Sequence, residues 1–339
     1  MRKWKNGAFC ALLALLMVTT TGCPGKDGGS SSVGESSSLS GSSSSSSSEA
    51  TIPEGTNIFA DANFDLGFDI YGTGINGATR DVQKTVKFQD DATPIWSFAQ
   101  WYSQHKLDQG NLTLNDNLFK LEDESKSIQV NRRTGAVTMA LNGAKEFTSV
   151  QTPGAVFWPH LLLQQTYTPV HFKDCTTMRA YLKFRMDRAT DCSAQFGSLP
   201  IGMQAQFAWF IYVKNVNPES PGKDEFLWFG FNLYDPTKLY TTTISQQDFA
   251  GGTLGNYIYA AGVQGWGQPG TRVDIGKTVT LDVDMFKLVK KALNVAHDAG
   301  FMTNTTIEDC AITGMNIGFE VFDVWDMQAT IFNLGVYYT

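Results

Sequence analysis

Short apolar or alternating stretches recur between turn signals from about Asn57 to the C-terminus, and this pattern limits the fold most strongly. In residues 178–186, every second side chain is apolar, and the intervening positions carry mostly charged groups. A period of two with one polar face predicts a half-buried antiparallel strand. A composition with 12% aromatic residues and 32 glycines also favours β structure over a helical bundle.

Other stretches of the same kind predict a sheet-rich domain in residues 56–339. Further strands are predicted at residues 118–121, 127–130, 136–141, 207–213, 226–234, 315–320 and 328–338. Turn residues at 131–135 and at Asn142-Gly143 separate some of them. Apolar residues at helical spacing occur in residues 285–299. The prediction is an all-β fold, a two-sheet antiparallel β-sandwich of the jelly-roll type, with one flanking helix near 285–299.

The N-terminal segment predicts export. Basic residues near the start precede an apolar run at residues 9–18, which is too short to span a bilayer. The sequence Thr20-Thr21-Gly22-Cys23 resembles the lipobox of bacterial lipoproteins, although Thr20 stands where leucine is usual. The resemblance implies lipidation of Cys23 and a chain anchored to a bacterial membrane, at the cell surface or outer membrane. Simple cleavage near Gly22 is the alternative.

Residues 24–55 are predicted to be a disordered linker, because serine dominates them and seven consecutive serines occupy 42–48. The segment resembles the poly-serine linkers of secreted polysaccharide-degrading systems. Residues 1–23, 24–55 and 56–339 are thus predicted to be signal and lipidation site, linker and a single domain.

Charge and motifs exclude several functions. A formal charge of −7 argues against nucleic acid as a partner. Four histidines without zinc-ligand spacing predict no metal site, and phosphate-binding and dinucleotide-binding glycine motifs and the Gly-x-Ser-x-Gly motif are absent from the sequence. No cofactor is predicted. Structural calcium remains an open alternative, and its candidate ligands are Asp90, Asp91, Asp224, Glu225 and Asp235.

Two stretches resemble the strands of exported, concanavalin A-like carbohydrate-active sandwiches: residues 316–320 with 326–334, and residues 226–231 with Tyr234-Asp235. The resemblance concerns architecture and implies a polysaccharide or oligosaccharide as the partner. Fold alone does not define function.

Four residues are candidates for catalysis. Glu320 and Asp323 are the best carboxylate cluster for glycoside hydrolysis. Their spacing of three departs from the Glu-x-Asp-x-x-Glu pattern of laminarinase-like glucanases and predicts opposite strand faces, so that Asp323 and Asp326 are interpreted as solvated turn residues or calcium ligands. His160 and His171 could supply the base of a lyase. The sandwich-lyase motifs are absent, and a structural role for His160 is the simpler interpretation.

Sugar binding requires no catalytic group. It requires flat aromatic faces beside polar groups. The candidates are Trp158, Trp228, Tyr234, Asp235, Trp266 and Gln268. Trp266 lies in the glycine-rich run 262–270, which is predicted to be a loop with an exposed indole.

Three cysteines follow Cys23. Cys175 and Cys192 bracket a predicted strand and should be too far apart for a bridge, whereas pairing with Cys310 or three free thiols both remain open.

The leading hypothesis is a lipid-anchored, non-catalytic carbohydrate-binding sandwich. The alternative is a polysaccharide lyase or glycoside hydrolase on the same fold. A third hypothesis is a structural or adhesin-like envelope lipoprotein without a sugar ligand.

Overall fold

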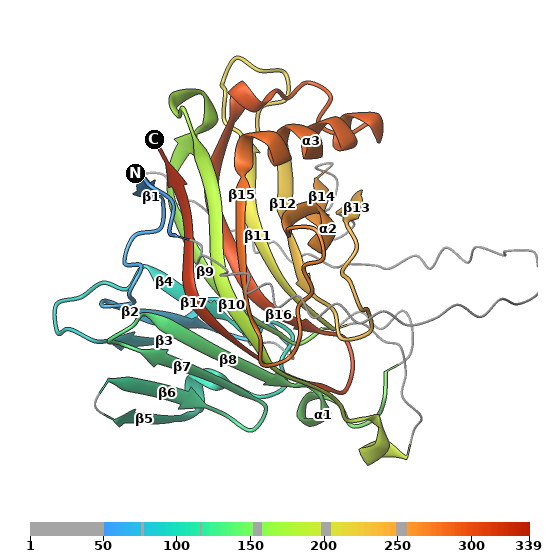
Figure 1. Ribbon diagram of the computed structural model, residues 1–339. Helices are drawn as coiled ribbons and strands as arrows, with labels where there is room; N and C mark the ends of the chain where they lie inside the picture. The colour runs from blue at the N-terminus through green and yellow to red at the C-terminus, as the bar shows by residue number, and fades with distance from the viewer. Residues whose placement is uncertain (1–50, 76–77, 116, 152–157, 198–204, 249–255) are drawn as a thin grey trace, which may run out of the picture.

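Two β-sheets stacked face to face form the body of the molecule in the computed structural model (Figure 1). The structure describes residues 51–339 except 76–77, 116, 152–157, 198–204 and 249–255. The predicted signal segment, Cys23 and most of the serine-rich linker lie outside the described residues. The prediction of a two-sheet all-β sandwich is confirmed.

The first sheet has eight strands in the order β15-β10-β17-β8-β7-β6-β5, with β1 paired to β17. Its strands are β1 (Thr56–Asn57), β5 (Asn111–Asn115), β6 (Leu118–Glu122), β7 (Lys126–Asn131), β8 (Ala136–Asn142), β10 (Met178–Asp191), β15 (Thr278–Asp284) and β17 (Trp325–Tyr338). The first strand of the described residues meets the C-terminal strand here, because Thr56 lies opposite Tyr338.

The second sheet has nine strands in the order β13-β14-β12-β11-β16-β9-β4-β2-β3. Its strands are β2 (Gly67–Tyr71), β3 (Val82–Lys87), β4 (Trp96–Ala99), β9 (His160–His171), β11 (Ala205–Asn215), β12 (Phe226–Tyr234), β13 (Ile244–Gln247), β14 (Tyr257–Ala261) and β16 (Cys310–Val321). Pairing among the described strands is antiparallel except at β12–β14 and β2–β4, which are parallel.

Large side chains from both sheets fill the space between them. Phe184 of β10 and Phe207 of β11 have ring centroids 5.8 Å apart, and Phe68 of β2 lies 4.9 Å from Phe119 of β6. All four are almost completely buried. Full burial of one such side chain contributes about 1.5–3 kcal/mol, so this aromatic layer is a main source of stability.

The predicted flanking helix is α3 (Met285–Asp298), and it lies across one end of the sandwich (Figure 1). Asp284 caps it by accepting a hydrogen bond from the Lys287 amide at 3.2 Å. Its buried side is Met285, Leu288, Val289, Ala292, Leu293 and Ala296, which matches the predicted apolar stripe. Shorter helices are α1 (Gly143–Glu146), α2 (Val263–Trp266) and the 3₁₀ turns η1 (Leu107–Gln109), η2 (Phe172–Asp174), η3 (Ser193–Phe196) and η5 (Ile307–Asp309).

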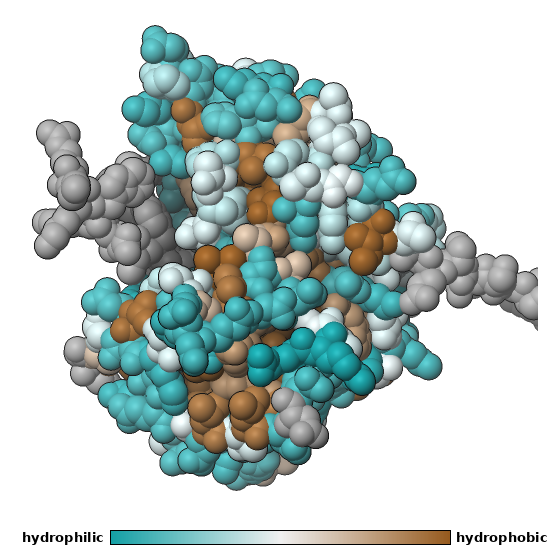
Figure 2. Space-filling model, turned by 90° about the vertical axis from the view of Figure 1, so that its left-hand side faces the viewer, coloured by the Kyte–Doolittle hydropathy of each residue, from teal (hydrophilic) through white to brown (hydrophobic). Residues whose placement is uncertain are grey.

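One edge of the first sheet carries uncovered apolar side chains. Leu112, Leu114 and Leu118 of β5 and β6 are 52%, 60% and 41% exposed. Figure 2 shows apolar side chains gathered low on the side of the molecule where Figure 1 places these strands. A sheet edge with exposed apolar side chains can pair with other chains. No helix of the described part is long and apolar enough to cross a membrane.

The cysteines in the described part of the chain are unbonded. Cys175, Cys192 and Cys310 are all free thiols, which agrees with the expectation that Cys175 and Cys192 do not pair. Burial raises the pKa of Cys310 to about 12. A thiol that stays protonated at neutral pH is a poor nucleophile.

Candidate functional site

The nine-stranded sheet has a second apolar cluster on the face turned away from the core. Strand alternation produces it: in β11, Phe207 and Trp209 enter the core, whereas Ala208 and Phe210 point to the other side. We call this side the outer face. Its apolar cluster contains Trp158, Ala208, Phe210, Trp228, Ile258, Ala260 and Phe322. The predicted sugar-binding residues Trp158 and Trp228 therefore belong to one cluster on this side of the sheet, where they are 6% and 5% exposed.

Three polar residues form a row across this face. Antiparallel register places Glu320 of β16 opposite His160 of β9 on one side and opposite Gln206 of β11 on the other. Gln206 Nε2 donates to Glu320 Oε2 at 2.9 Å, and His160 Nε2 lies 3.7 Å from Glu320 Oε1. The three side chains are 0–4% exposed. Two of the four catalytic candidates, His160 and Glu320, are thus brought into contact.

Burial determines the protonation of this row. Loss of hydration raises the pKa of Glu320 to about 7, and the charge of Asp248 adds to this effect, whereas the Gln206 hydrogen bond opposes it. Loss of hydration also lowers the pKa of His160 to about 4. Between these pH values both groups are neutral, so they do not form an ion pair.

The histidine tautomer follows from its neighbours. His160 Nδ1 contacts the carbonyl oxygen of Trp158, which can only accept a hydrogen bond. The neutral ring therefore carries its proton on Nδ1, and Nε2 presents a lone pair toward Glu320 Oε1. Because Glu320 Oε2 already accepts from Gln206, the carboxyl proton belongs on Oε1. The carboxyl proton of Glu320 therefore lies on the side that faces the neutral ring of His160.

A second carboxylate lies on the same face. Asp248, directly after β13, accepts a hydrogen bond at Oδ2 from Trp228 Nε1 at 3.0 Å and is 1% exposed. Its charge is one of the causes that raise the pKa of Glu320. The outer face therefore carries two buried carboxyl groups, Glu320 and Asp248.

Amide side chains of the outer face have unsatisfied polar atoms. Among the described residues, the buried atoms Asn232 Oδ1, Gln246 Nε2, Asn256 Nδ2 and Asn316 Oδ1 have no hydrogen-bond partner. Strand alternation and register place these four residues on the outer face together with Glu320. Buried polar atoms are nearly always paired, so these two donors and two acceptors are exceptions.

The other predicted ligand-binding residues lie elsewhere. Tyr234 packs against the core between the sheets, and Asp235 is fully buried and paired with Lys238 Nζ at 2.9 Å. Gln268 is exposed and lines a separate surface hollow of about 580 Å³.

The expectation for Trp266 is wrong. Its glycine-rich segment forms α2 rather than a loop at that point, and the indole is 4% exposed inside the core. Its Nε1 donates to the Asn232 carbonyl at 3.3 Å. This packing places the Trp266 side chain in the core between the sheets, away from the outer face.

The other two catalytic candidates are not part of the polar row: His171 is remote from it, and Asp323 stabilises a turn. His171 lies at the opposite end of β9 from His160. Asp323 forms the β16–β17 turn, as predicted, because its Oδ1 accepts from the amides of Gln151 and Val324 at 3.0 and 2.8 Å. It is fully buried, however, so the expectation of a solvated turn residue is wrong.

The calcium candidates do not converge. Asp224 pairs with Lys214 Nζ at 2.7 Å, and Asp235 pairs with Lys238. Within the described ranges, no group of three or more His, Cys, Asp or Glu side chains could hold a metal ion. Structural calcium stays a prediction.

Sequence reasoning missed Gln206, Asp248 and the four amides. The one local signal is Gln206, a polar residue directly before the apolar run 207–213 of β11. Asp248 and the amides become significant only through strand register, which a single sequence does not define.

No family model and no curated protein matches the chain. Among solved structures, it is similar to a ligand-bound family 12 xyloglucanase from Bacillus licheniformis, with 12% identity and a TM-score of 0.38, over 73% of this chain and 100% of that one. It is also similar to the endoglucanase Cel12A of Rhodothermus marinus, with 11% identity and a TM-score of 0.33, over 68% and 96%. Likeness at this level says nothing about activity.

Proposed function

We propose that this chain is a glycoside hydrolase acting on an extracellular polysaccharide, and that the outer face of the nine-stranded sheet binds the glycan. Glu320 is the general acid. The observation that carries the proposal is the placement of a carboxyl group with a pKa of about 7 beside aromatic rings and unpaired buried amides. Hydroxyl groups of a sugar satisfy both donors and acceptors, and pyranose rings pack on indole faces.

The chemistry assigned to Glu320 follows from its proton. Glycoside cleavage requires an acid that protonates the departing oxygen and a second carboxylate that attacks the sugar or activates a water. Glu320 is largely protonated just below neutral pH, and Asp248 is the second carboxylate. His160 and Gln206 hold the Glu320 side chain in place from either side.

A substitution of the acid separates catalysis from binding. Full-length protein, purified in detergent, is incubated with a panel of neutral and acidic polysaccharides, and new reducing ends are counted. Glu320→Gln keeps the shape and the Gln206 contact but cannot donate the proton, so kcat should fall about 10²–10⁴-fold with binding retained. The matched control is Glu308→Gln, which removes an exposed carboxylate near the opposite end of β16 and should leave kcat unchanged.

Absence of new reducing ends from every glycan with the unaltered protein would refute the hydrolase. An increase in absorbance near 235 nm would instead indicate a lyase.

Carbohydrate binding without cleavage is the second candidate. The aromatic cluster and the unpaired amides suffice for binding, and neither needs a titrating carboxyl group. Retention of a glycan in affinity gels together with no cleavage would favour it.

The N-terminal segment adds a location to this proposal. Lipidation of Cys23 would tether the hydrolase to a bacterial membrane through the serine-rich linker. Multiple acyl chains, each contributing about 0.8 kcal/mol per buried CH₂, would make such an anchor stable.

A further inference from the structure

A cationic and aromatic rim lies beside the polar row. Its members are Arg80, Trp101 and Tyr102, all half-buried. The Arg80 guanidinium carbon is 5.7 Å from the Trp101 ring centroid and 5.0 Å from that of Tyr102. Both rings also contact the imidazole of His160, at centroid distances of 6.0 and 5.8 Å. The rim is thus continuous with the row that contains Glu320.

Backbone contacts fix the two rings in position. The Trp101 carbonyl accepts from the His160 amide at 2.9 Å, and the Tyr102 amide donates to the Thr73 carbonyl at 2.9 Å. Tyr102 adopts a left-handed φ of 58°, which residues other than glycine rarely hold without support.

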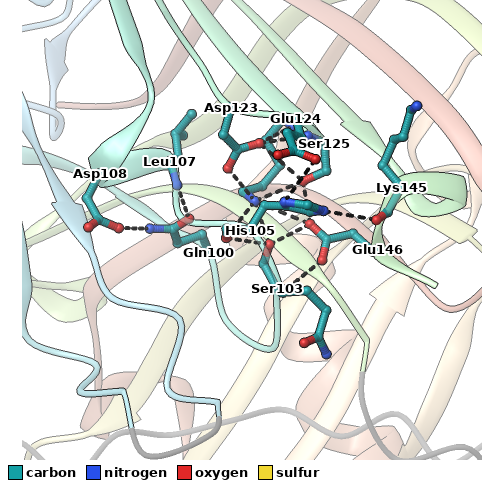
Figure 3. Close-up of polar contacts among 12 residues, drawn as sticks. Gln100, Ser103, His105, Leu107, Asp108, Asp123, Glu124, Ser125, Lys145 and Glu146 are labelled. Carbon is teal, nitrogen blue, oxygen red and sulfur yellow. Dashed lines mark hydrogen bonds and ion pairs between the residues drawn. The ribbon is translucent and has the colours of Figure 1, made fainter. Parts of the chain in front are cut away.

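A buried polar network supplies that support from the next residues along the chain (Figure 3). Ser103 Oγ and the Gln104 amide each donate to Glu146, at 2.5 Å. Lys126 Nζ donates to Ser103 Oγ and lies 3.3 Å from Glu146 Oε1. The segment that carries Trp101 and Tyr102 is therefore anchored immediately behind the rings.

The side chain of Arg80 is confined as well. A Cβ added at Gly74 would come within 2.4–3.0 Å of its Nε, Cγ and Cδ atoms, so the arginine stem packs directly against that glycine. The Arg80 guanidinium lies within cation–π distance of both rings. Its charge reaches the row, because Arg80 contributes to the lowered pKa of His160.

An additional donor points to a ligand at the rim. Among the described residues, the buried Nε1 of Trp101 has no hydrogen-bond partner. A fixed cation, two aromatic rings and an unpaired N–H are together suited to a pyranose that carries an anion.

We infer that Arg80, Trp101 and Tyr102 form a subsite for a negatively charged sugar, one bearing a carboxylate or a sulfate ester. The inference rests on the proposed function in that the glycan lies on the outer face. It adds that the substrate is an acidic polysaccharide.

Affinity electrophoresis of the full chain with pairs of glycans that differ in charge tests this subsite. The pairs are polygalacturonate with its carboxyl-reduced form, and dextran sulfate with unmodified dextran. The unaltered protein should bind at least one charged form more tightly than its partner. Arg80→Gln should reduce that preference about tenfold or more, as expected for a lost charge-assisted contact, while Arg80→Lys keeps part of it. Arg133→Gln, which removes an exposed charge from the β7–β8 turn, is the matched control.

Each result either supports or overturns the subsite. Equal binding of charged and uncharged forms, equal weakening of both by Arg80→Gln, or no retention of any glycan would overturn it. A preserved charge preference without cleavage would remove the hydrolase and leave the subsite. Cleavage of neutral glycans without any charge preference would overturn the subsite and keep the hydrolase.

Discussion

Glu320 and His160 are buried next to each other, and burial shifts their pKa values in opposite directions. Each shift has the same cause, since removal of water disfavours whichever form is charged. The carboxyl therefore keeps its proton and the imidazole stays without one. This arrangement avoids a buried ion pair, whose desolvation is expensive.

The two shifts predict opposing pH effects on stability. A raised carboxyl pKa stabilises the fold fully below the unfolded value near 4.5, and this stability is lost as pH rises to about 7. A lowered imidazole pKa stabilises the fold above 6.5, and this stability is lost as pH falls to about 4. In the unaltered protein the two effects partly cancel.

Single variants should reveal each slope in urea unfolding at pH 4.5–7. Glu320→Gln should leave a free energy of unfolding that rises with pH, and His160→Gln one that falls with pH. The full effect of each group is on the order of 3 kcal/mol. Parallel pH profiles for both variants would contradict the protonation states assigned to the row.

Lys126 and Glu146 present the opposite case, a charged pair kept inside the protein. Lys126 Nζ lies 2.8 Å from Asp123 Oδ2 and 3.3 Å from Glu146 Oε1, and both charged atoms of the Lys126–Glu146 pair are fully buried. Removal of the lysine alone leaves buried carboxylates without their cation.

Lys126→Met should therefore lower the free energy of unfolding by about 3–5 kcal/mol. The double variant Lys126→Met/Glu146→Gln should recover part of the loss, because one stranded charge is also gone. Both are measured by urea denaturation. A loss below about 1 kcal/mol for the single variant would show that the network contributes little.

At the scale of elements, β16 is the strand that assembles the site. It pairs with β9 on one side and β11 on the other, and so brings His160 and Gln206 to Glu320. Close packing of β9 on β16 depends on Gly318, where an added Cβ would lie 2.1 Å from the Leu161 carbonyl oxygen.

Gly318→Ala should consequently separate β9 from β16. We expect a loss of more than about 2 kcal/mol in unfolding free energy, since backbone atoms cannot move aside as a flexible side chain can. Gly300→Ala is the control, because that glycine also has a positive φ, of 82°, but open space around it. Its cost should be about 1 kcal/mol. Equal costs for the two variants would exclude the steric explanation.

The sequence predicts elements where one periodicity dominates. Residues 178–186 alternate and form part of β10, and the apolar stripe of 285–299 forms α3. Residues 262–270 mislead, because glycine enrichment conceals a short helix that places Trp266 in the core. Asn142-Gly143 likewise caps α1 instead of making a hairpin turn.

Prediction of the site is limited by pairing between distant strands. Trp158, Trp228, His160 and Glu320 are recognisable as candidates by residue type, but nothing local shows that they share a face. Register joins residues that are more than a hundred positions apart, such as Gln206 and Glu320. Local propensity carries no information about such pairs.

At the scale of the whole molecule, attachment is the property to test. Cys23→Ser removes the proposed acylation site, so the protein should move from the membrane fraction to the soluble fraction with its glycan cleavage unchanged. Membrane and soluble fractions are compared by immunoblot. Continued sedimentation of the variant with membranes would exclude an acyl anchor at Cys23.

The pairing of β1 with the end of β17 also bears on how a tethered molecule would be oriented. The described chain enters the sandwich at β1, beside Tyr338 at the end of β17, whereas Trp325 begins β17 only five positions after Glu320. A strand of 14 residues spans about 45 Å. A membrane anchor N-terminal to β1 would therefore hold the sandwich at the end that contains Tyr338. Glu320 would then lie near the opposite end, away from the membrane. Polysaccharides too large to approach the lipid surface could still bind through the chain segment nearest to the protein.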